Sequence, residues 1–333
     1  MSTVDVILPI YRPGEEFLHI LELLKKQTRK PHRIIVMNTE EKYFDNLVYG
    51  KKFDDDADSL RVYHLAKSEF DHAGTRNKGV KHSTADYFVL MTMDAVPADD
   101  KLIEHLIAPL ERGEAVVSYA RQLPKDDAGP IERYTRSFNY PPESLLKGAE
   151  DLKRLGIKTF FCSDVCAAYD RKTFDALGGF EEPAIFNEDM IFAHKAVQAG
   201  RKIAYTADAS VYHSHNYTAR EQFRRNFDLG VSQADHPEIF EAYPSEGEGI
   251  RMVKKTAAYL WKHKKGYLVG KLVVHSGAKY IGYRLGKRYK KLRYGTVRRC
   301  TSNPAYWNRR FRKFAASHID ATKGYGRNPD KES

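Results

Sequence analysis

The sequence has few cysteines and no long apolar run. Its three cysteines, Cys162, Cys166 and Cys300, are too few and too odd in number for a disulfide framework, and we expect the first two to be buried as small apolar residues. A zinc site would need further cysteine or histidine ligands close by. No stretch of about 18 uncharged apolar residues occurs, so we expect no membrane-spanning helix. The first residues lack the basic and apolar blocks of a signal peptide, so we expect a cytoplasmic protein.

Acidic residues are nearly missing from the last quarter of the chain. Residues 251–333 hold 23 Lys and Arg against 3 Asp and Glu, whereas residues 1–250 hold 32 basic and 41 acidic residues. The hydrophobic share of 42% suffices for a sizeable core, and the charged share of 30% is typical of a globular protein. An acidic body with a basic tail favours an anionic partner for the tail, either a membrane or a nucleic acid.

Strand and helix patterns alternate along the first half of the chain, which predicts an α/β fold with a mostly parallel sheet covered by helices. Ligands of such sheets bind beyond the carboxyl ends of the strands, so residues 9–12, residues 38–40 and Asp94 should lie close together. We expect strands at 4–8, 33–37, 60–65, 87–91, 114–119, 158–168 and 202–205, and helices at 17–24, 73–83, 99–110, 187–199 and 219–234.

The body of the chain is predicted to end near residue 245, because residues 244–249 have the composition of a linker or turn. Beyond it, residues 267–292 carry an apolar stripe beside many basic side chains. This pattern is typical of a basic amphipathic helix at a membrane interface. The alternative is a helix packed on the body with its basic face in solvent.

Two segments at the expected edge of the sheet are suited to nucleotide binding. Pro9 ends the hydrogen bonding of the first strand and Tyr11 offers a ring for stacking on a base, although an ordinary turn explains the same residues. In residues 70–79, Gly74 allows close approach of a ligand to the backbone, and Arg76 can pair with a diphosphate. The alternative there is a capped surface helix.

Three further segments are suited to metal binding and acid–base chemistry. Asp94 ends an apolar strand, where a carboxylate holds a hard cation or else caps the next helix. Glu188 and Asp189 open a helix, so either is suited to act as a general base, although first-turn acids also simply favour the helix dipole. His213 and His215 are two residues apart on an extended segment and complete a metal site with Asp94, unless they are structural.

Taken together and in this order, these segments resemble glycosyltransferase family 2, which has the GT-A fold, over residues 3–235. The similarity is greatest to the bacterial rhamnosyltransferases, and is carried by FDHAGTRNKG, MTMDAVP, FFCSDVCAAYDRKTFDALGGF, NEDM and VYHSHNYT. The resemblance implies a GT-A (Rossmann-like) domain at 1–245, with helices on both faces of the sheet. A basic helical region at 246–333, associated with the membrane, would follow it.

The resemblance also implies a role for each candidate residue. Asp189 matches the catalytic base and Glu188 its neighbour, while Asp164 would bind sugar hydroxyls of the acceptor. Residues that would bind the nucleotide, ribose or diphosphate of the donor are Pro9, Tyr11, Asn38, Glu40, His72, Arg76, Asn77 and Asp94.

The metal motif departs from that of the family. Asp94 matches the last acid of an Asp-x-Asp motif and His213 or His215 matches a metal-contacting histidine, but Thr92 replaces the first acid. One carboxylate fewer implies a weaker or more hydrated site for a divalent cation, Mg²⁺ or Mn²⁺. The acid that follows the family's second strand is also altered, to Asn38-Thr39-Glu40.

The reaction implied is an inverting sugar transfer from a nucleoside-diphosphate sugar, with dTDP-L-rhamnose favoured over UDP- and GDP-sugars. The acceptor would be a glycan or a lipid-linked glycan of a cell-surface polysaccharide. The enzyme would be peripheral on the inner face of the cell membrane, held to anionic lipid by its C-terminal region.

Three rival interpretations remain at this stage. A nucleic-acid-binding protein would suit the tail, but the acidic body lacks a nucleic-acid module, so no nucleic acid is expected. A nucleotidyltransferase would carry a glycine-rich loop after the first strand, where this chain has Tyr11-Arg12-Pro13-Gly14-Glu15. A noncatalytic binding module is disfavoured by Glu188 and Asp189 but is compatible with Thr92.

Overall fold

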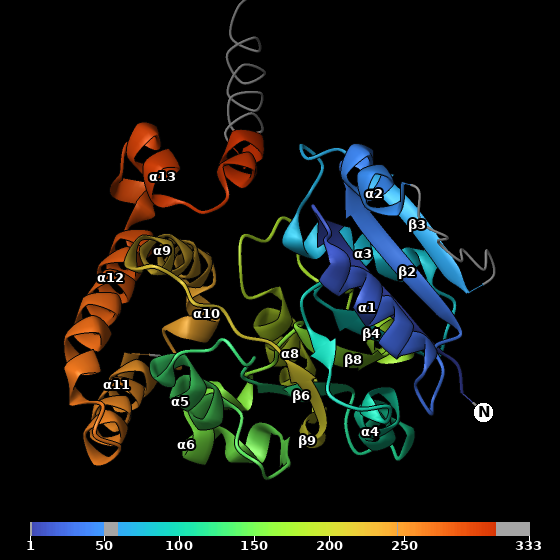
Figure 1. Cartoon of the computed structure of the whole chain (residues 1–333), viewed down its shortest axis with the longest axis horizontal. Coiled ribbons are helices and arrows are strands. Elements are labelled where there is room, and N and C mark those ends of the chain that lie inside the picture. Colours follow the sequence, from blue (N-terminus) through green and yellow to red (C-terminus); the bar gives the residue numbers. More distant parts are fainter. Residues whose placement is uncertain (1, 50–58, 245, 311–333) are drawn as a thin grey trace, which may run out of the picture.

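The computed structural model describes residues 2–49, 59–244 and 246–310, and within these ranges a nine-stranded sheet forms the centre (Figure 1). The strand order is β3-β2-β1-β4-β8-β6-β9-β5, and β7 pairs with β9. The first four strands are parallel, whereas β8 is antiparallel to both of its neighbours. The strands are β1 (Val4–Tyr11), β2 (Arg33–Thr39), β3 (Leu60–Leu65), β4 (Tyr87–Met91), β5 (Val96–Pro97), β6 (Val117–Leu123), β7 (Leu145–Lys147), β8 (Cys166–Asp170) and β9 (Ile203–Tyr212).

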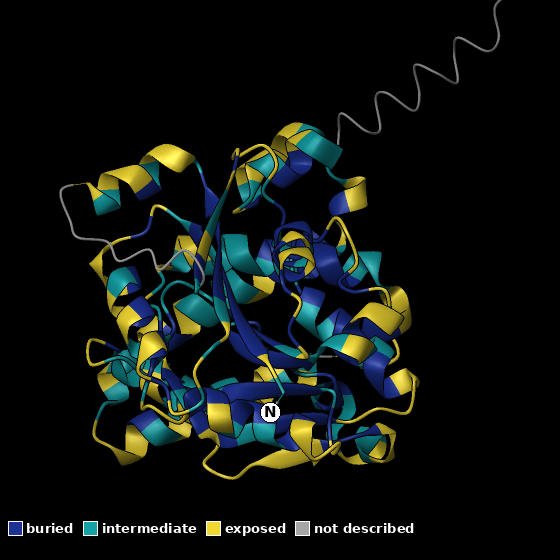
Figure 2. Ribbon diagram, turned by 90° about the vertical axis from the view of Figure 1, so that its right-hand side faces the viewer, coloured by how far each residue is buried: buried dark blue, intermediate teal, exposed yellow. Residues whose placement is uncertain are grey.

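The central strands are buried on both faces, which explains their nearly unbroken apolar sequences. Along β1, Val6 and Leu8 pack on one face and Ile7 on the other, because successive side chains of a strand point to opposite sides. Figure 2 shows these strands buried between helices whose outer faces are exposed. The predicted α/β fold is therefore confirmed.

Helices cover both faces of the sheet, as predicted. Apolar side chains of α1 (Glu15–Lys25), α2 (Glu41–Val48) and α4 (Leu102–Glu111) join the core on one face. The other face is covered by α3 (His72–His82), α7 (Arg171–Ala176) and α8 (Glu188–Gln198). The loops that enter α3 and α8 carry most of the polar side chains described below.

The C-terminal helices form a layer beside the sheet (Figure 1). They are α9 (Ala219–Asp235), α10 (Pro237–Phe240), α11 (Glu246–Lys262), α12 (Val269–Lys287), α13 (Tyr294–Cys300) and a final helix at 304–310. Helices α9 and α12 touch through glycines: a Cβ on Gly282 would lie 2.2 Å from the carbonyl oxygen of Phe223. A third apolar cluster joins α9 to the last helices through Phe227, Val231, Tyr289 and Trp307.

Several predicted elements differ from the observed ones. Only residues 166–168 of the expected strand at 158–168 are extended, as the start of β8, because residues 156–159 form a 3₁₀ turn and residues 160–165 a loop. The expected linker at 244–249 is largely helical, since α11 begins at Glu246. The single helix expected over 267–292 is α12 between two 3₁₀ turns.

The domain boundary near 245 stays a prediction, and residues 311–333 of the predicted C-terminal region lie outside the described residues. The first and second cysteines are buried and unpaired, as expected. Across the described ranges, no helix combines the length and the apolar character needed to cross a membrane.

Candidate active site

The carboxyl ends of β1, β2, β3 and β4 lie along one edge of the sheet. Tyr11 is level with Thr39, and Thr39 is level with Leu65. Asp94 follows the end of β4, next to the loop before β8, where the backbone N–H of Thr92 donates to the carbonyl of Val165 at 3.1 Å. The strand ends and the loop that carries Asp94 therefore lie at one edge of the sheet.

Asp94, His213 and His215 form a cluster of metal-ligand type. Their nearest carboxylate-to-Nε2 distances are 3.6 Å for His213 and 3.2 Å for His215, and the two Nε2 atoms are 3.0 Å apart. Asp94 does not cap a helix, because α4 begins only at Leu102. Burial opposes ionisation of Asp94, but hydrogen bonds from both histidines outweigh it and hold the pKa of its carboxyl well below its usual range.

Gln122, a residue that the sequence did not single out, orients this cluster. Its side-chain oxygen lies 3.0 Å from Nδ1 of His213 and accepts a further hydrogen bond from Arg136. Because that oxygen accepts from Arg136, it also accepts from Nδ1–H of His213, so His213 turns its other ring nitrogen, Nε2, toward Asp94. The amide nitrogen of Gln122 donates to Ser163 at 2.9 Å, which links the cluster to the loop that carries Asp164.

Arg76 lies in a buried group of acids beside that loop. Its guanidinium is 3.2 Å from Asp164 and 3.1 Å from Glu188, and it donates to the carbonyl of His72 at 2.9 Å. Tyr169 donates to the other oxygen of Asp164 at 2.6 Å. Burial raises the pKa of Asp164 to about 7, against the lowering effect of Arg76. Arg76 is thus committed to carboxylates, and its predicted contact with a diphosphate stays a prediction.

Asp189, at the start of α8, is half-buried and directly adjoins this group. One of its oxygens accepts the backbone N–H of Asp164 at 3.2 Å, and the other accepts that of Met190 at 2.7 Å. Burial and the charges of Asp164 and Glu188 raise the pKa of Asp189 well above its usual range. A carboxylate with a raised pKa is a stronger base, which suits the general-base role predicted for it.

The chain enters α8 through Asn187, which is left-handed with φ of 63°. Asparagine tolerates this conformation, and its side chain donates to Ser232 on α9 at 3.2 Å. Ser232 in turn donates to the carbonyl of Phe186 at 2.7 Å. The position of Asp189 therefore depends on α9 as well as on the sheet.

At the strand ends, the residues predicted to bind the donor substrate make polar contacts with one another and with their neighbours. Lys67 donates to the hydroxyl of Tyr11 at 3.1 Å, and its backbone N–H donates to Glu40 at 2.7 Å. Asn38 is fully buried, and its amide nitrogen lies 2.9 Å from Nδ1 of His64. Neither His64, which lies within β3, nor Lys67, which follows it, was singled out from the sequence, because this strand carries no distinctive motif.

Three other donor candidates have different surroundings. Pro9 lies inside β1 and does not end it, because the pairing with β4 stops at Ile7 and β2 alone continues alongside. The side-chain amide of Asn77 exchanges hydrogen bonds with the backbone of Phe180, at 2.9 and 3.1 Å. His72 is partly buried, its backbone carbonyl accepts from Arg76, and burial lowers the pKa of its imidazole. Their contacts with a donor remain predictions.

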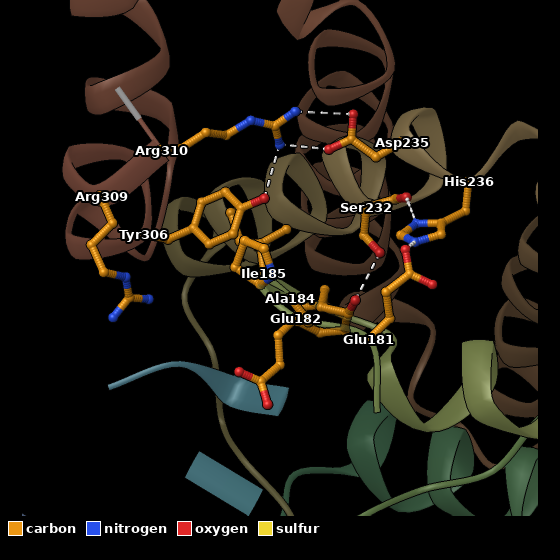
Figure 3. Close-up of a pocket in the computed structure, with 12 residues that line it drawn as sticks. Glu181, Glu182, Ala184, Ile185, Ser232, Asp235, His236, Tyr306, Arg309 and Arg310 are labelled. Atoms are coloured by element: carbon orange, nitrogen blue, oxygen red, sulfur yellow. Dashed lines mark hydrogen bonds and ion pairs between the residues drawn. The ribbon is translucent and has the colours of Figure 1, made fainter. Parts of the chain in front are cut away.

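A pocket of about 470 Å³ lies behind the loop that enters α8 (Figure 3). Arg310 of the final helix reaches Asp235 at 2.6 Å, and His236 faces Glu181 at 3.3 Å. Arg309 donates to the carbonyl of Ser68 at 3.0 Å. Neither the metal-type cluster nor Asp189 lines this pocket, so we assign it to the packing of the C-terminal helices against the loops that carry the site.

A mixed sheet covered by helices on both faces, with a polar edge at the ends of its parallel strands, is the architecture of the GT-A fold. The chain belongs to glycosyl transferase family 2, whose family model matches residues 5–178.

Relatives extend the similarity to most of the chain. The O-antigen chain rhamnosyltransferase RfbN of Salmonella typhimurium is 38% identical over 307 residues, covering 92% of this chain and 96% of that protein. The O-antigen chain rhamnosyltransferase WbaN of Salmonella anatum is 37% identical over 323 residues, with the same coverage. Among solved structures, the mannosyltransferase PcManGT from Pyrobaculum calidifontis, in complex with GDP-Man and Mn²⁺, has a TM-score of 0.51. At 14% identity over 92% of this chain and 85% of that one, it supports the fold alone.

Proposed function

We propose that this enzyme transfers L-rhamnose from dTDP-L-rhamnose to a glycan or lipid-linked acceptor in the synthesis of a bacterial cell-surface polysaccharide. The observation that carries the proposal is the similarity to two O-antigen chain rhamnosyltransferases over 92% of the chain. That span includes the C-terminal layer as well as the family domain. The arrangement of Asp189 with Asp164 supplies the chemistry that such a transfer needs.

Asp189 is the proposed general base. Its carboxylate takes the proton of the acceptor hydroxyl while that oxygen forms a bond to the anomeric carbon of the donor. The bond from this carbon to the diphosphate breaks, and the nucleoside diphosphate leaves with the electron pair. Because attack and departure occur on opposite faces, the configuration of the anomeric carbon inverts. Asp164 is the proposed contact for sugar hydroxyls of the acceptor.

Asp94, His213 and His215 are the proposed holders of a divalent cation. Two imidazole nitrogens 3.0 Å apart, both facing one carboxylate, are a donor set that fits a metal ion. The imidazole pair favours Mn²⁺ over Mg²⁺, which prefers oxygen ligands. Such an ion supplies positive charge to the diphosphate of the donor. Gln122 fixes the ring of His213 for this purpose.

The C-terminal layer is the proposed membrane-binding surface, which would place the enzyme on the inner face of the cell membrane. Of the apolar stripe predicted from the sequence, Tyr267, Val274 and Ile281 are more than half exposed, and Trp261 on α11 is 69% exposed. The face of α12 that packs on α9 is a different one. Exposed apolar side chains among basic ones fit an anionic lipid surface by charge and by burial.

The donor specificity is tested by the thermal stability of the purified protein with dTDP, UDP or GDP, each with and without Mn²⁺ or Mg²⁺. A ligand that binds the native state raises its stability by mass action. We expect dTDP with Mn²⁺ to raise the Tm most, and the D94N variant to lose the metal-dependent part. Preferential stabilisation by UDP or GDP would replace the proposed sugar nucleotide, and no response to any nucleotide would contradict the proposed function.

A further inference from the structure

The proposed reaction builds negative charge on a diphosphate, and the nearest predicted cation, Arg76, is already paired with two carboxylates. A further positive group should therefore face the site. Arg225 on α9 is such a group. It lies in the C-terminal layer, on the helix that also anchors the entry to α8.

The guanidinium of Arg225 lies between the metal-type cluster and the start of α8. Its central carbon is 4.8 Å from the ring centre of Tyr217 and 5.5 Å from that of Phe186. The ring of Tyr217 is in turn 4.9 Å from that of His215, in the metal-type cluster. Phe186 directly precedes Asn187 and the two acids of α8. One aromatic ring thus separates Arg225 from the metal-type cluster, and another separates it from the start of α8.

Arg225 makes no direct ion pair with an acid in the described part of the chain, although its charge acts on Asp228 one turn further along α9. Among the described residues it has no ion pair within 4.0 Å and no hydrogen bond, and its contacts are the two ring faces. By contrast, Arg309 and Arg310 of the final helix each pair with a carboxylate. Aromatic faces hold a guanidinium in place without using its N–H groups, which remain available to an oxyanion.

Lys279 on α12 adds a second cation near Arg225, because it lies one turn before Gly282, which touches Phe223 on α9. It is half-buried and likewise has no ion pair within the described part of the chain. Burial lowers the pKa of its ammonium, and the charges of Arg136 and Arg225 lower it further against the raising effect of Glu132. Glu132 itself is paired with Arg136 at 2.7 Å. The charges of Arg136 and Arg225 therefore both act on Lys279, and Arg136 hydrogen-bonds Gln122 beside the metal-type cluster.

We propose that Arg225 and Lys279 form an anion subsite for a phosphate group of a substrate. The inference rests on the proposed function, because it assigns the subsite to the same transfer reaction. Two sources supply this chemistry: the diphosphate of the nucleotide donor, or a phosphate carried by the acceptor. Arg225 binds the oxygens through its free N–H groups, and Lys279 adds charge from behind.

The experiment measures binding of inorganic diphosphate and of dTDP to the full-length protein by calorimetry. The diphosphate titration is made in EDTA, so that binding through a metal ion is excluded. The dTDP titration is made with Mn²⁺. The variants are R225Q and K279Q, and the matched control is R220Q, an exposed arginine one turn earlier on α9. Thermal unfolding verifies that each variant is folded. If R225Q does not fold, the test rests on K279Q.

We expect R225Q and K279Q each to weaken diphosphate binding at least tenfold, while R220Q leaves it unchanged. A parallel loss of dTDP affinity assigns the subsite to the donor, and unchanged dTDP affinity assigns it to the acceptor. Wild-type affinity for diphosphate in both variants, or no binding by the wild-type protein, overturns the subsite. Such a failure leaves the proposed function testable through the nucleotide panel, which does not depend on Arg225.

Discussion

At the scale of single residues, the negative charge around Asp189 sets the pH range of the reaction. A base works only when deprotonated, and the pKa of Asp189 is raised by burial and by Asp164 and Glu188. We therefore expect kcat/KM to fall as the pH is lowered, and to begin falling at a pH well above the usual range of a carboxyl. In D164N one neighbouring charge is lost, so this acidic limb should move to lower pH. A pH profile of both proteins in which the limb stays in place would contradict the coupling.

The residues of the site differ in how far the sequence reveals them. Asp94 and the pair His213 and His215 were found because chemistry-bearing residue types follow apolar strands at short spacing. Gln122 and Arg225 were missed, because a glutamine on a strand and an arginine on a helix have no distinctive pattern. Their roles arise from neighbours 91 and 39 positions away, such as His213 and Phe186, which only the fold brings together.

At the scale of elements, the contact between α9 and α12 depends on glycine. A Cβ on Gly286 would lie 2.1 Å from the carbonyl oxygen of Phe227, so G286A must push the helices apart. We expect the free energy of unfolding to fall by about 1–3 kcal/mol, as for other overpacked contacts. The control is G277A on the same helix, where a Cβ meets nothing within 4 Å and alanine favours the helix by roughly 1 kcal/mol. Equal stability of the two variants in urea denaturation would contradict this packing.

The predicted bounds of β2 and α9 lie within two residues of the observed ones, whereas β1 continues three residues past its predicted end at residue 8. The prediction failed at residues 158–165, whose aromatic and β-branched residues resemble a strand. The loop is held instead by Lys147, which is fully buried and donates to the carbonyl of Lys158 at 3.1 Å. A buried lysine satisfied by backbone carbonyls is a tertiary feature that no local pattern encodes.

At the scale of the whole molecule, the basic C-terminal layer carries the proposed membrane surface. Replacing Val274 and Ile281 together by Ser removes apolar area that would enter the bilayer interface. We expect binding to phosphatidylglycerol vesicles to weaken about tenfold or more. The control is Y49S, since Tyr49 is 88% exposed at the end of α2, across the molecule from α12 (Figure 1). Unchanged binding of the double variant in vesicle sedimentation would exclude this face as the contact.

The charge asymmetry between body and tail was visible in composition alone, but the packing of the tail helices on the body was not. The sequence left open whether the tail helix lies on the body or on a membrane. In the structure, α12 packs on α9 through Gly282 and Gly286 and still leaves Val274 and Ile281 exposed. The structure thus confirms that the helix packs on the body, and membrane binding by its exposed face stays a prediction.

Asp189 is the proposed base that deprotonates the acceptor hydroxyl, and substitution of this one residue is the sharpest test of that role. Rhamnose transfer from dTDP-L-rhamnose to a lipid-linked acceptor fraction would be compared for the wild-type protein, D189N and D208N, an exposed aspartate on β9. We expect D189N to lose roughly 10²–10⁴-fold in turnover while it keeps the stabilisation by dTDP, and D208N to behave as wild type. Wild-type turnover in D189N would exclude Asp189 as the base.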